Sequence, residues 1–551
     1  MNERKTGEWM KHYNESMERY PDRQDERKTV SGITRKPLYT FSDLKDFHEN
    51  EDLGMPGEYP YTRGIYPSMY RGRLWTKRFL VGLQSPEVFN VRQKEMLDAG
   101  QNGINFVPCN SYFRGYDSDM VDKELLGRCG TTIDSLEDME IAFEGIPLDR
   151  VSLGMNDFGP FMMVASVVAM AEKRGIPLSQ IQGTTNQSDF ISHFVSCNQP
   201  IRFGLEGHLR MLVDHVIFCT KNLPKWHPVS VVGQHMQQAG ATPVQALAFT
   251  LATAVFYVDA FIKSGLQVDD FAPRFSFFFD VSGDLFEEVA KFRAARRMWA
   301  KIMRDRFKAK DPRSWLMRFH AQTSGTELTQ QQPLNNITRA CIHTLAAVFG
   351  GAQSIHTDAY DEPLWSPTEK SQRVAIMTQN IIAEESGVAD VIDPLGGSYY
   401  LESLTNEVED MSWNYIQKIN EMGGMFQAVQ QGFIQKEIMK SSFDHQKQVD
   451  SGNRVVVGLN KYFVREEESL SDQIKVDSEL IEKQIQRTKC IRETRDQQKA
   501  GDAIEKLHNA AMSAEENIFQ AVIDAVKENI THGEIVAELR NIYGFGRPLL
   551  V

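Results

Sequence analysis

From about residue 80 onward, short apolar or β-branched runs alternate with longer segments that have helical periodicity. Six runs have the length and composition of strands: residues 103–109, 151–155, 181–185, 230–235, 274–281 and 315–322. The helical pattern between them covers residues 161–174, 205–221, 243–262 and 285–304. Strands spaced roughly 30 to 50 residues apart, each followed by a helix, are typical of βαβ units and predict a parallel sheet.

Two further strands, near residue 80 and within 345–390, would complete a (β/α)8 TIM barrel. A doubly wound open sheet is the alternative. No G-x-G-x-x-G or G-x-x-x-x-G-K-[ST] motif follows a strand, so the dinucleotide-binding and P-loop forms of that sheet lose support. We expect an N-terminal arm over residues 1–58, the α/β barrel over 59–400 and a C-terminal helical region over 401–551.

The overall composition argues against several classes of protein. The 551 residues carry a net charge of −13, whereas surfaces that bind nucleic-acid phosphates are normally basic. No apolar run reaches the about eighteen residues of a membrane helix, and the polar N-terminus lacks the apolar core of a signal peptide. The six cysteines show no C-x-x-C spacing, so we expect neither disulfides nor a cysteine zinc site, and a cytoplasmic location.

Residues 59–78, YPYTRGIYPSMYRGRLWTKR, combine four arginines, one lysine and five aromatic residues. Guanidinium groups pair with phosphates and stack on rings, so this composition suits an anionic and planar ligand such as an adenine nucleotide. The alternative is an amphipathic segment whose rings pack on the barrel. Arg274 and Arg318 lie in predicted strands and would add cations to Arg73 and Arg78 above the barrel mouth, unless they form buried ion pairs between strands.

Three histidines end or follow predicted strands: His235, His320 and His356. Active sites of (β/α)8 barrels lie at the C-terminal ends of the strands. With nearby carboxylates, these histidines would suit the metal site of a hydrolase; the candidates are Asp358, Asp361 and Glu362. No H-x-H or H-E-x-x-H spacing supports that hypothesis, and we expect no metal.

Ordered motifs give the chain a more specific resemblance. They include RGYDSD (114–119), GQHMQQAGAT (233–242), FAPRFSFFF (271–279), HAQTSG (320–325), QSIHTDAYDE (353–362) and VIDPLGGSYYLE (391–402). Together with residues 59–78, they resemble the large subunit of the methylmalonyl-CoA mutase family, of the isobutyryl-, pivalyl- or 2-hydroxyisobutyryl-CoA mutase kind. The resemblance runs from about residue 59 to about 462. It implies an adenosylcobalamin-dependent acyl-CoA mutase whose barrel encloses the acyl-CoA along its axis.

The cobalamin-binding domain of that family has no counterpart in this sequence. Its D-x-H-x-x-G signature does not occur, and DFHENE at 46–51 lacks the glycine. The residues after 462 are too few for a linker and a second α/β domain. The resemblance therefore implies that a separate small subunit carries most of the adenosylcobalamin, and it admits a GTPase chaperone as a further partner.

The chemistry that the resemblance implies is a radical 1,2-rearrangement, in which the thioester carbonyl group migrates to a neighbouring carbon. His235 and Gln187 correspond to the residues that hydrogen-bond this carbonyl and are the catalytic candidates. Glu362, Asp358 and Gln353 are the expected cofactor-binding residues. The expected CoA-binding residues are Ser68, Arg73, Thr76, Arg78, Arg274 and Ser276.

Positions at which this sequence differs from the family limit which acyl groups can be the substrate. Leu80 and Cys197 stand where methylmalonyl-CoA mutase has a Tyr and an Arg that hold the substrate carboxylate. Losing a buried charge partner costs about 3–5 kcal/mol, so a dicarboxylic acyl group is disfavoured unless Arg71 or Arg202 approaches. A methylmalonyl-type enzyme stays an alternative on those terms.

Hydroxyacyl mutases place an acid where Val107 stands, which leaves a hydroxyacyl substrate as a second alternative. An apolar pocket of Leu80, Val107 and Cys197 instead suits a branched saturated acyl-CoA, of the isobutyryl/butyryl or the bulkier pivalyl/isovaleryl pair. Phe113 stands where the family has His, and VPCNSY (107–112) is unlike the usual strand end. These changes either reshape the pocket or mark a non-catalytic, acyl-CoA-binding paralogue.

Overall fold

The computed structural model describes residues 3–21, 27–44, 47–82, 84–196, 202–464 and 476–546. These residues contain short parallel strands that form two five-stranded sheets, in the orders β1-β10-β9-β8-β7 and β2-β3-β4-β5-β6. The strands are β1 (Thr76–Arg78), β2 (Leu80–Val81), β3 (Gly103–Phe106), β4 (Ser152–Asn156), β5 (Gln182–Asn186), β6 (Lys225–His227), β7 (Val229–Val232), β8 (Phe275–Val281), β9 (Phe319–Thr323) and β10 (Ser354–His356).

The two sheets are halves of one barrel. Only Phe79 separates β1 from β2 and only Pro228 separates β6 from β7, so each pair is one strand interrupted at a seam. Parallel neighbours then lead from β2 through β3, β4 and β5 to β6, and from β7 through β8, β9 and β10 back to β1. This closed order of eight strand positions confirms the (β/α)8 barrel.

The predicted strands occur with shifted ends, and the two additional strands are β1–β2 and β10. The largest shifts concern two histidines. β7 ends at Val232, because Gly233 has helical backbone angles (φ −81°, ψ −20°), and His235 lies in the next helix. β9 begins at Phe319, after a 3-10 turn at Pro312–Trp315, so the strand starts four residues later than predicted.

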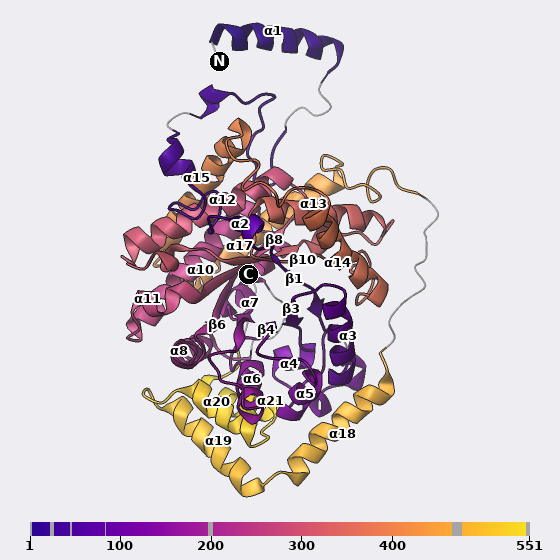
Figure 1. The fold of residues 1–551 in the computed structure, drawn as a ribbon, viewed down its shortest axis with the longest axis vertical. Helices are drawn as coiled ribbons and strands as arrows, with labels where there is room; N and C mark the ends of the chain where they lie inside the picture. The colour runs from indigo at the N-terminus through magenta and orange to yellow at the C-terminus, as the bar shows by residue number, and fades with distance from the viewer. Residues whose placement is uncertain are drawn as a thin grey trace.

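Helices cover the outside of the barrel and fill the turns that follow its strands (Figure 1). The longer ones are α3 (Pro86–Asp98), α6 (Met162–Lys173), α8 (Leu205–Asn222), α10 (Pro243–Lys263), α12 (Leu285–Lys301), α13 (Asn335–Phe349) and α14 (Glu369–Glu384). The shorter ones are α2 (Met69–Gly72), α4 (Asn110–Arg114), α5 (Leu136–Ala142), α7 (Phe190–Ser196), α9 (Gln234–Gln238) and α11 (Val268–Phe271).

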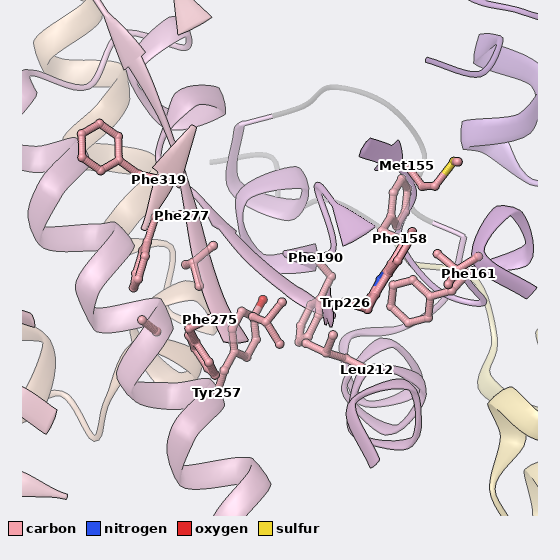
Figure 2. Close-up of a cluster of buried hydrophobic side chains, with 14 of the residues drawn as sticks. Met155, Phe158, Phe161, Phe190, Leu212, Trp226, Tyr257, Phe275, Phe277 and Phe319 are labelled. Atoms are coloured by element: carbon pink, nitrogen blue, oxygen red, sulfur yellow. The ribbon is translucent and has the colours of Figure 1, made fainter. Parts of the chain in front are cut away.

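Alternate strand residues build the core between the sheets and the helices. In β8, Phe275 and Phe277 point outward and contact Trp299 of α12, with ring centroids 5.6 and 5.0 Å apart. Figure 2 shows these rings with Phe319, on the side of the strands that the helices cover. The two-residue period of a strand therefore turns Ser276 toward the barrel axis. The core is a shell around the axis, which leaves the axis free for other side chains.

The apolar helix α10 belongs to this shell. It has the length and composition of a membrane-spanning helix, but 78% of its most apolar window is buried inside the fold. No second helix in the described part of the chain meets the same criteria.

The C-terminal helical region packs on two sides of the barrel. α15 (Tyr399–Glu421) lies against α10 and α12, and it is followed by α16 (Met425–Gln430) and α17 (Phe433–Asp450). On the other side, α20 (Ile518–Lys527) packs on α6 and α8, and α19 (Gln497–Met512) packs on α20 and on α21 (His532–Tyr543). α18 (Ser478–Thr494) contacts the 3-10 turn at Ser118–Met120, and these last helices are drawn in yellow in Figure 1. The region is therefore part of the barrel's outer layer.

The N-terminal residues have two different environments. Helix α1 (Glu3–Arg19) stands apart from the barrel in Figure 1. Further along, the hydroxyl of Thr29 and the backbone N–H groups of Val30 and Ser31 donate hydrogen bonds to Glu287 in the first turn of α12. The arm is thus anchored to the barrel beyond α1.

Candidate active site in the barrel

Small and polar side chains line the barrel axis, whereas bulky branched residues fill most (β/α)8 barrels. They surround a cavity of about 190 Å³ near the N-terminal ends of the strands. Its small lining residues are Thr76, Ser152, Gly154, Gly183, Thr184, Ser230, Ser276 and Ser354. The sequence thus leaves a narrow channel where other barrels have a packed core.

Arg78 is a buried cation beside this channel. Its Nη2 donates to the Ser152 hydroxyl at 2.6 Å and its Nη1 to the Ile104 carbonyl at 3.2 Å, while Nε has no partner. No described carboxylate interacts with it, and burial lowers its pKa to about 10. A buried guanidinium with a free N–H and no counter-ion is suited to bind an anionic or carbonyl oxygen of a ligand.

Two glycines make room for this guanidinium. A Cβ atom on Gly154 would lie 2.8 Å from Nη1 of Arg78 and 2.5 Å from Oδ1 of Asn105, and one on Gly103 would lie 3.2 Å from Nε. Both distances to Gly154 are shorter than Cβ contacts allow, so a side chain there would displace the ends of Arg78 and Asn105 from their present positions.

The remaining expected CoA-binding residues lie around the same end. Ser276 lines the narrow cavity, while Ser68 and Arg73 are exposed beside α2. Arg274 directly precedes β8 and donates to the carbonyls of Thr220 and Asp270. Arg318 directly precedes β9 and donates to the Pro273 carbonyl at 3.0 Å. Arg318 also donates to the Tyr66 hydroxyl at 3.3 Å. Both arginines therefore lie at the N-terminal mouth and donate to carbonyl and hydroxyl oxygens, without the alternative ion pairs between strands in the described part of the chain.

A second and larger cavity, of about 820 Å³, opens at the C-terminal ends of the strands. Two expected substrate-pocket residues, Leu80 and Val107, line it together with two expected cofactor-binding residues, Asp358 and Glu362. Other lining residues include Gln84, Gln322, His356 and Trp365. The structure therefore brings residues from both predicted sets into one space.

The wall of this cavity that follows β10 is acidic. Leu80 N–H donates to Nδ1 of His356 at 3.2 Å, so Nε2 of His356 carries the proton that it shares with Asp358 Oδ1 at 2.7 Å. The other oxygen of Asp358 has no partner. Glu362 is accessible from the cavity, yet desolvation by the surrounding protein, together with the charges of Asp358 and Asp361, raises its pKa to about 8. This wall offers hydrogen-bonding carboxyl groups to a polar ligand.

His235 lies at a corner built from aromatic rings. His193 meets it edge to face with centroids 4.5 Å apart, and Phe158 stacks on His193 at 4.3 Å. Phe113 stacks on Phe158 at 6.0 Å. Burial lowers the pKa of His235 to about 4, so its imidazole is neutral at physiological pH. The row joins the expected pocket residue Phe113 to the expected catalytic His235 by ring contacts, and neither is among the residues that line the larger cavity.

Gln187 reaches the same corner from β5. It directly follows the strand with a left-handed backbone (φ 63°), and its backbone bonds the imidazole of His193. Asp189, two residues later, accepts hydrogen bonds from the backbone N–H of Ile191 at the start of α7 and from that of Val232 in β7. The turn after β5 is thereby fixed against the strand that leads to His235.

Comparison with known proteins agrees with this geometry. Residues 28–545 match the family model described as methylmalonyl-CoA mutase. The chain belongs to the methylmalonyl-CoA mutase family. It is 40% identical over 531 residues to the "2-hydroxyisobutanoyl-CoA mutase large subunit" of Aquincola tertiaricarbonis, covering 96% of this chain and 94% of that protein.

Larger relatives match as well. The chain is 40% identical over 518 residues to the mitochondrial methylmalonyl-CoA mutase of Homo sapiens, covering 94% of this chain and 68% of that protein. For the methylmalonyl-CoA mutase of Rhizobium meliloti (strain 1021) the identity is 40% over 520 residues, with 94% and 72% covered. The relatives are mutases, which are isomerases, and this confirms the enzyme class that the sequence resemblance implied.

Within this mutase fold, two expectations from the sequence change. Gln353 lies before β10 and lines the narrow N-terminal cavity, away from Asp358 and Glu362, so it does not join the expected cofactor group. His320 lines that same cavity, because it is the second residue of β9, and it bonds the Ser354 hydroxyl at 2.7 Å. His320 and His356 therefore line different cavities, and no group of three or more potential metal ligands occurs among the described residues.

The two arginines considered for a substrate carboxylate are both engaged elsewhere. Arg202 is completely buried, and its guanidinium donates to Asp157 and to the carbonyls of Tyr112, Phe113, Phe158 and Gly159. Arg71 is exposed and donates to the Asp390 carbonyl at 2.8 Å. Cys197 lies outside the described residues.

Several residues of the candidate site carry no signal in the sequence. His193 and Ser192 lie on the short helix α7, which has neither a motif nor a long hydrophobic pattern. Asn105, Asn156 and Asn186 form an amide ladder across β3, β4 and β5, with bonds of 3.1 and 2.6 Å. A single inward asparagine in each strand is visible only after the register of the strands is known.

Proposed function

We propose that this chain is the catalytic subunit of an adenosylcobalamin-dependent acyl-CoA mutase that rearranges a branched, uncharged acyl group. The substrates that fit are the isobutyryl/butyryl and the pivalyl/isovaleryl pairs. A separate small subunit would carry the cobalamin, and the name "large subunit" of the Aquincola tertiaricarbonis relative supports that division.

The observation that carries the choice of substrate is that, among the described residues, no buried cation points into the apolar end of the pocket; Arg128 lines the cavity but is exposed and donates to the Glu124 carbonyl at 2.7 Å. Leu80 and Val107 line the C-terminal cavity, and Arg202 has its donors satisfied by Asp157 and backbone carbonyls. Moving Arg202 to a substrate carboxylate would leave Asp157 and several carbonyls buried without their partner. That loss costs about 3–5 kcal/mol for the ion pair alone, so an uncharged acyl group is favoured.

The two cavities suit the two parts of the substrate and its cofactor. At the narrow end, Arg78, Arg274 and Arg318 offer cations for the phosphates and carbonyls of CoA. At the wide end, the unpartnered oxygen of Asp358 and the carboxyl group of Glu362 fit the hydroxyl groups of a ribose. When bound, adenosylcobalamin supplies the radical that starts the rearrangement.

The protein's own contribution is then to position, polarise and exclude water. His235 would donate a hydrogen bond from its imidazole to the thioester carbonyl, with Gln187 as a second contact. A neutral imidazole suits this role, because it can donate one N–H without placing a charge in the pocket. Burial lowers the pKa of His235 to about 4, so the imidazole is neutral before substrate binds. Phe113, Phe158 and His193 would close the pocket to water.

A hydroxyacyl substrate is the second candidate, favoured by two observations. The Aquincola tertiaricarbonis relative is named a 2-hydroxyisobutanoyl-CoA mutase large subunit. In addition, Nε2 of the buried His193 has no hydrogen-bond partner, so it is an acceptor for one hydroxyl group. Apolar Val107 lines the cavity at the position where hydroxyacyl mutases place an acid, which ranks this substrate below an alkyl one.

The direct test is turnover of a panel of acyl-CoAs. The purified chain, its small subunit and adenosylcobalamin would be mixed with isobutyryl-, pivalyl-, 2-hydroxyisobutyryl- and methylmalonyl-CoA, and products separated by mass-resolved chromatography. Rearrangement of an alkyl acyl-CoA with methylmalonyl-CoA inert is the expected result. Turnover of methylmalonyl-CoA alone would overturn the substrate assignment, and acyl-CoA binding without any turnover would favour the non-catalytic paralogue.

A double substitution tests the pocket residues. Leu80→Tyr with Cys197→Arg should shift the preference toward methylmalonyl-CoA, because it restores the family's partners for a carboxylate. Leu80→Phe with Cys197→Met is the matched control, since it changes volume without adding a charge. A preference for methylmalonyl-CoA that is no greater than in the control would show that these positions do not contact the acyl group.

A further inference from the structure

The proposed role of His235 depends on which ring nitrogen carries its proton. A neutral imidazole has one N–H donor and one bare acceptor nitrogen. Donation to a thioester carbonyl from Nε2 requires the proton on Nε2 and a bare Nδ1. Whatever contacts Nδ1 therefore decides whether the other nitrogen donates.

Nδ1 of His235 lies 3.2 Å from the hydroxyl oxygen of Ser192. Ser192 is completely buried, and its hydroxyl is also 3.1 Å from the Asp189 carbonyl. A hydroxyl has one hydrogen to donate. If that hydrogen goes to Asp189, the serine accepts N–H from Nδ1 and Nε2 is bare. If it goes to Nδ1, Nε2 keeps the proton.

The local structure favours donation to Nδ1. Asp189 directly precedes α7, a position whose carbonyl ordinarily accepts a backbone N–H of the first helical turn, so this oxygen has donors of the helix within reach besides the serine hydroxyl. An acceptor Nδ1 has no second donor among the described residues, since Ser192 is its one hydrogen-bonding contact there. By its position the Asp189 carbonyl has helix N–H groups as other donors, whereas a bare Nδ1 of His235 has only the serine hydroxyl among the described residues.

The serine is also held firmly in place. Asp189 accepts the backbone N–H of Ser192 at 3.3 Å and that of Val232 in β7 at 2.9 Å, and Tyr257 of α10 donates to the same carboxylate. β7 ends three residues before His235. These contacts tie helix α7, which carries the serine, to strand β7, which leads into the helix that carries the histidine. A fixed partner of this kind selects one tautomer of an imidazole.

We propose that Ser192 is a positioning residue, which donates its hydroxyl hydrogen to Nδ1 of His235 and keeps the imidazole proton on Nε2. The proposal rests on the proposed function, because it concerns the same histidine. Ser192 is a partner of His235 that the family resemblance did not supply. It acts through a hydrogen bond alone, and no covalent bond forms or breaks at the serine.

The tautomer is measured directly by ¹⁵N NMR of the full chain labelled in histidine, without cofactor or substrate. His235→Gln identifies the signals of His235. Wild-type protein should show a protonated Nε2 and an unprotonated Nδ1. Ser192→Ala should lose that preference, Ser192→Thr should retain it because it keeps the hydroxyl, and Ser166→Ala, a buried serine on α6, should leave it unchanged.

A proton on Nδ1 in the wild-type chain, or an unchanged tautomer in Ser192→Ala, would overturn the proposal. In the assembled enzyme, turnover by Ser192→Ala should fall about 10–100-fold, as for other supporting partners of histidines, and recover in Ser192→Thr. The function itself is tested separately: unchanged turnover by His235→Ala would remove the histidine from the mechanism whatever its tautomer is.

Discussion

The two ends of the barrel differ in size and in charge. At the N-terminal ends of the strands, a cavity of about 190 Å³ is bordered by the buried cation Arg78, which no described carboxylate neutralises. At the C-terminal ends, a cavity of about 820 Å³ is bordered by Asp358 and Glu362. The narrow end is thus suited to bind the anionic part of a ligand, and the wide end is suited to the reaction. Mutations at the two ends should therefore affect binding and turnover separately.

Single strands connect the two ends. Thr76 and Arg78 of β1 line the narrow cavity, and Leu80, two residues later, lines the wide one. On β10, Ser354 lines the narrow cavity and His356 the wide one. Because alternate strand residues share a face, a step of two residues along a strand moves from one environment to the other. The difference between the two ends of the barrel is therefore determined by the residues that face its axis.

The largest expected effect belongs to the wide end. His235→Ala should lower turnover by about 10²–10⁴-fold, the usual contribution of a positioned proton donor, while acyl-CoA binding persists. Turnover is measured with the assembled enzyme and binding by calorimetry on the chain alone. His227→Ala is a matched control, since that histidine lines the narrow cavity. Equal loss of turnover in both variants would contradict the division of labour between the ends.

A smaller effect of a different kind belongs to the narrow end. Arg78→Met should raise KM for acyl-CoA about 10- to 100-fold, because a charged hydrogen bond contributes about 1.5–3 kcal/mol, and should leave kcat within a few-fold. Lys77→Met is the control: its ammonium group donates to Asn380 of α14, on the outside of the barrel. A fall in kcat with unchanged KM would assign Arg78 to the chemical step instead.

The sequence was sufficient for the barrel, because alternating strand and helix patterns survive without any tertiary information. It was insufficient for the end of a strand at which a residue lies. His320 looked like a strand-end residue because the strand was predicted from 315, whereas Pro312–Trp315 forms a 3-10 turn and β9 begins at Phe319. Gln353 was predicted at the wrong end of the barrel for a related reason, because β10 begins at Ser354 and Gln353 directly precedes it.

The contacts at the wide end were beyond the sequence for another reason. Arg202 was considered as a carboxylate ligand because an arginine near the pocket is equally compatible with that role and with a structural one. Only the fold shows that its donors face Asp157 and four carbonyls. Ser192 and His193 likewise became site residues because Asp189 fixes α7 against β7, a contact between segments more than forty residues apart.

The smallest expected effect concerns the acidic wall. The pKa of Glu362 is raised from 4.5 in a free chain to about 8 in the fold, first by desolvation and then by Asp358 and Asp361. A raised pKa means that the folded state binds the proton more tightly, so this group stabilises the fold below about pH 4.5 relative to its ionised state. That stabilisation disappears as the pH rises through about 8.

Wild-type protein should therefore lose stability relative to Glu362→Gln as the pH rises from about 5 to about 8, and the difference should level off above that. The effect should be small, because the side chain is accessible from the cavity. Urea unfolding midpoints of both proteins across this range measure it, with Glu385→Gln, an exposed position at the end of α14, as the control. If the two variants follow the same pH dependence, the pKa of Glu362 is not raised in the fold. The carboxyl groups at the wide end would then not differ from exposed ones, and the contrast between the two ends would be weaker than the geometry indicates.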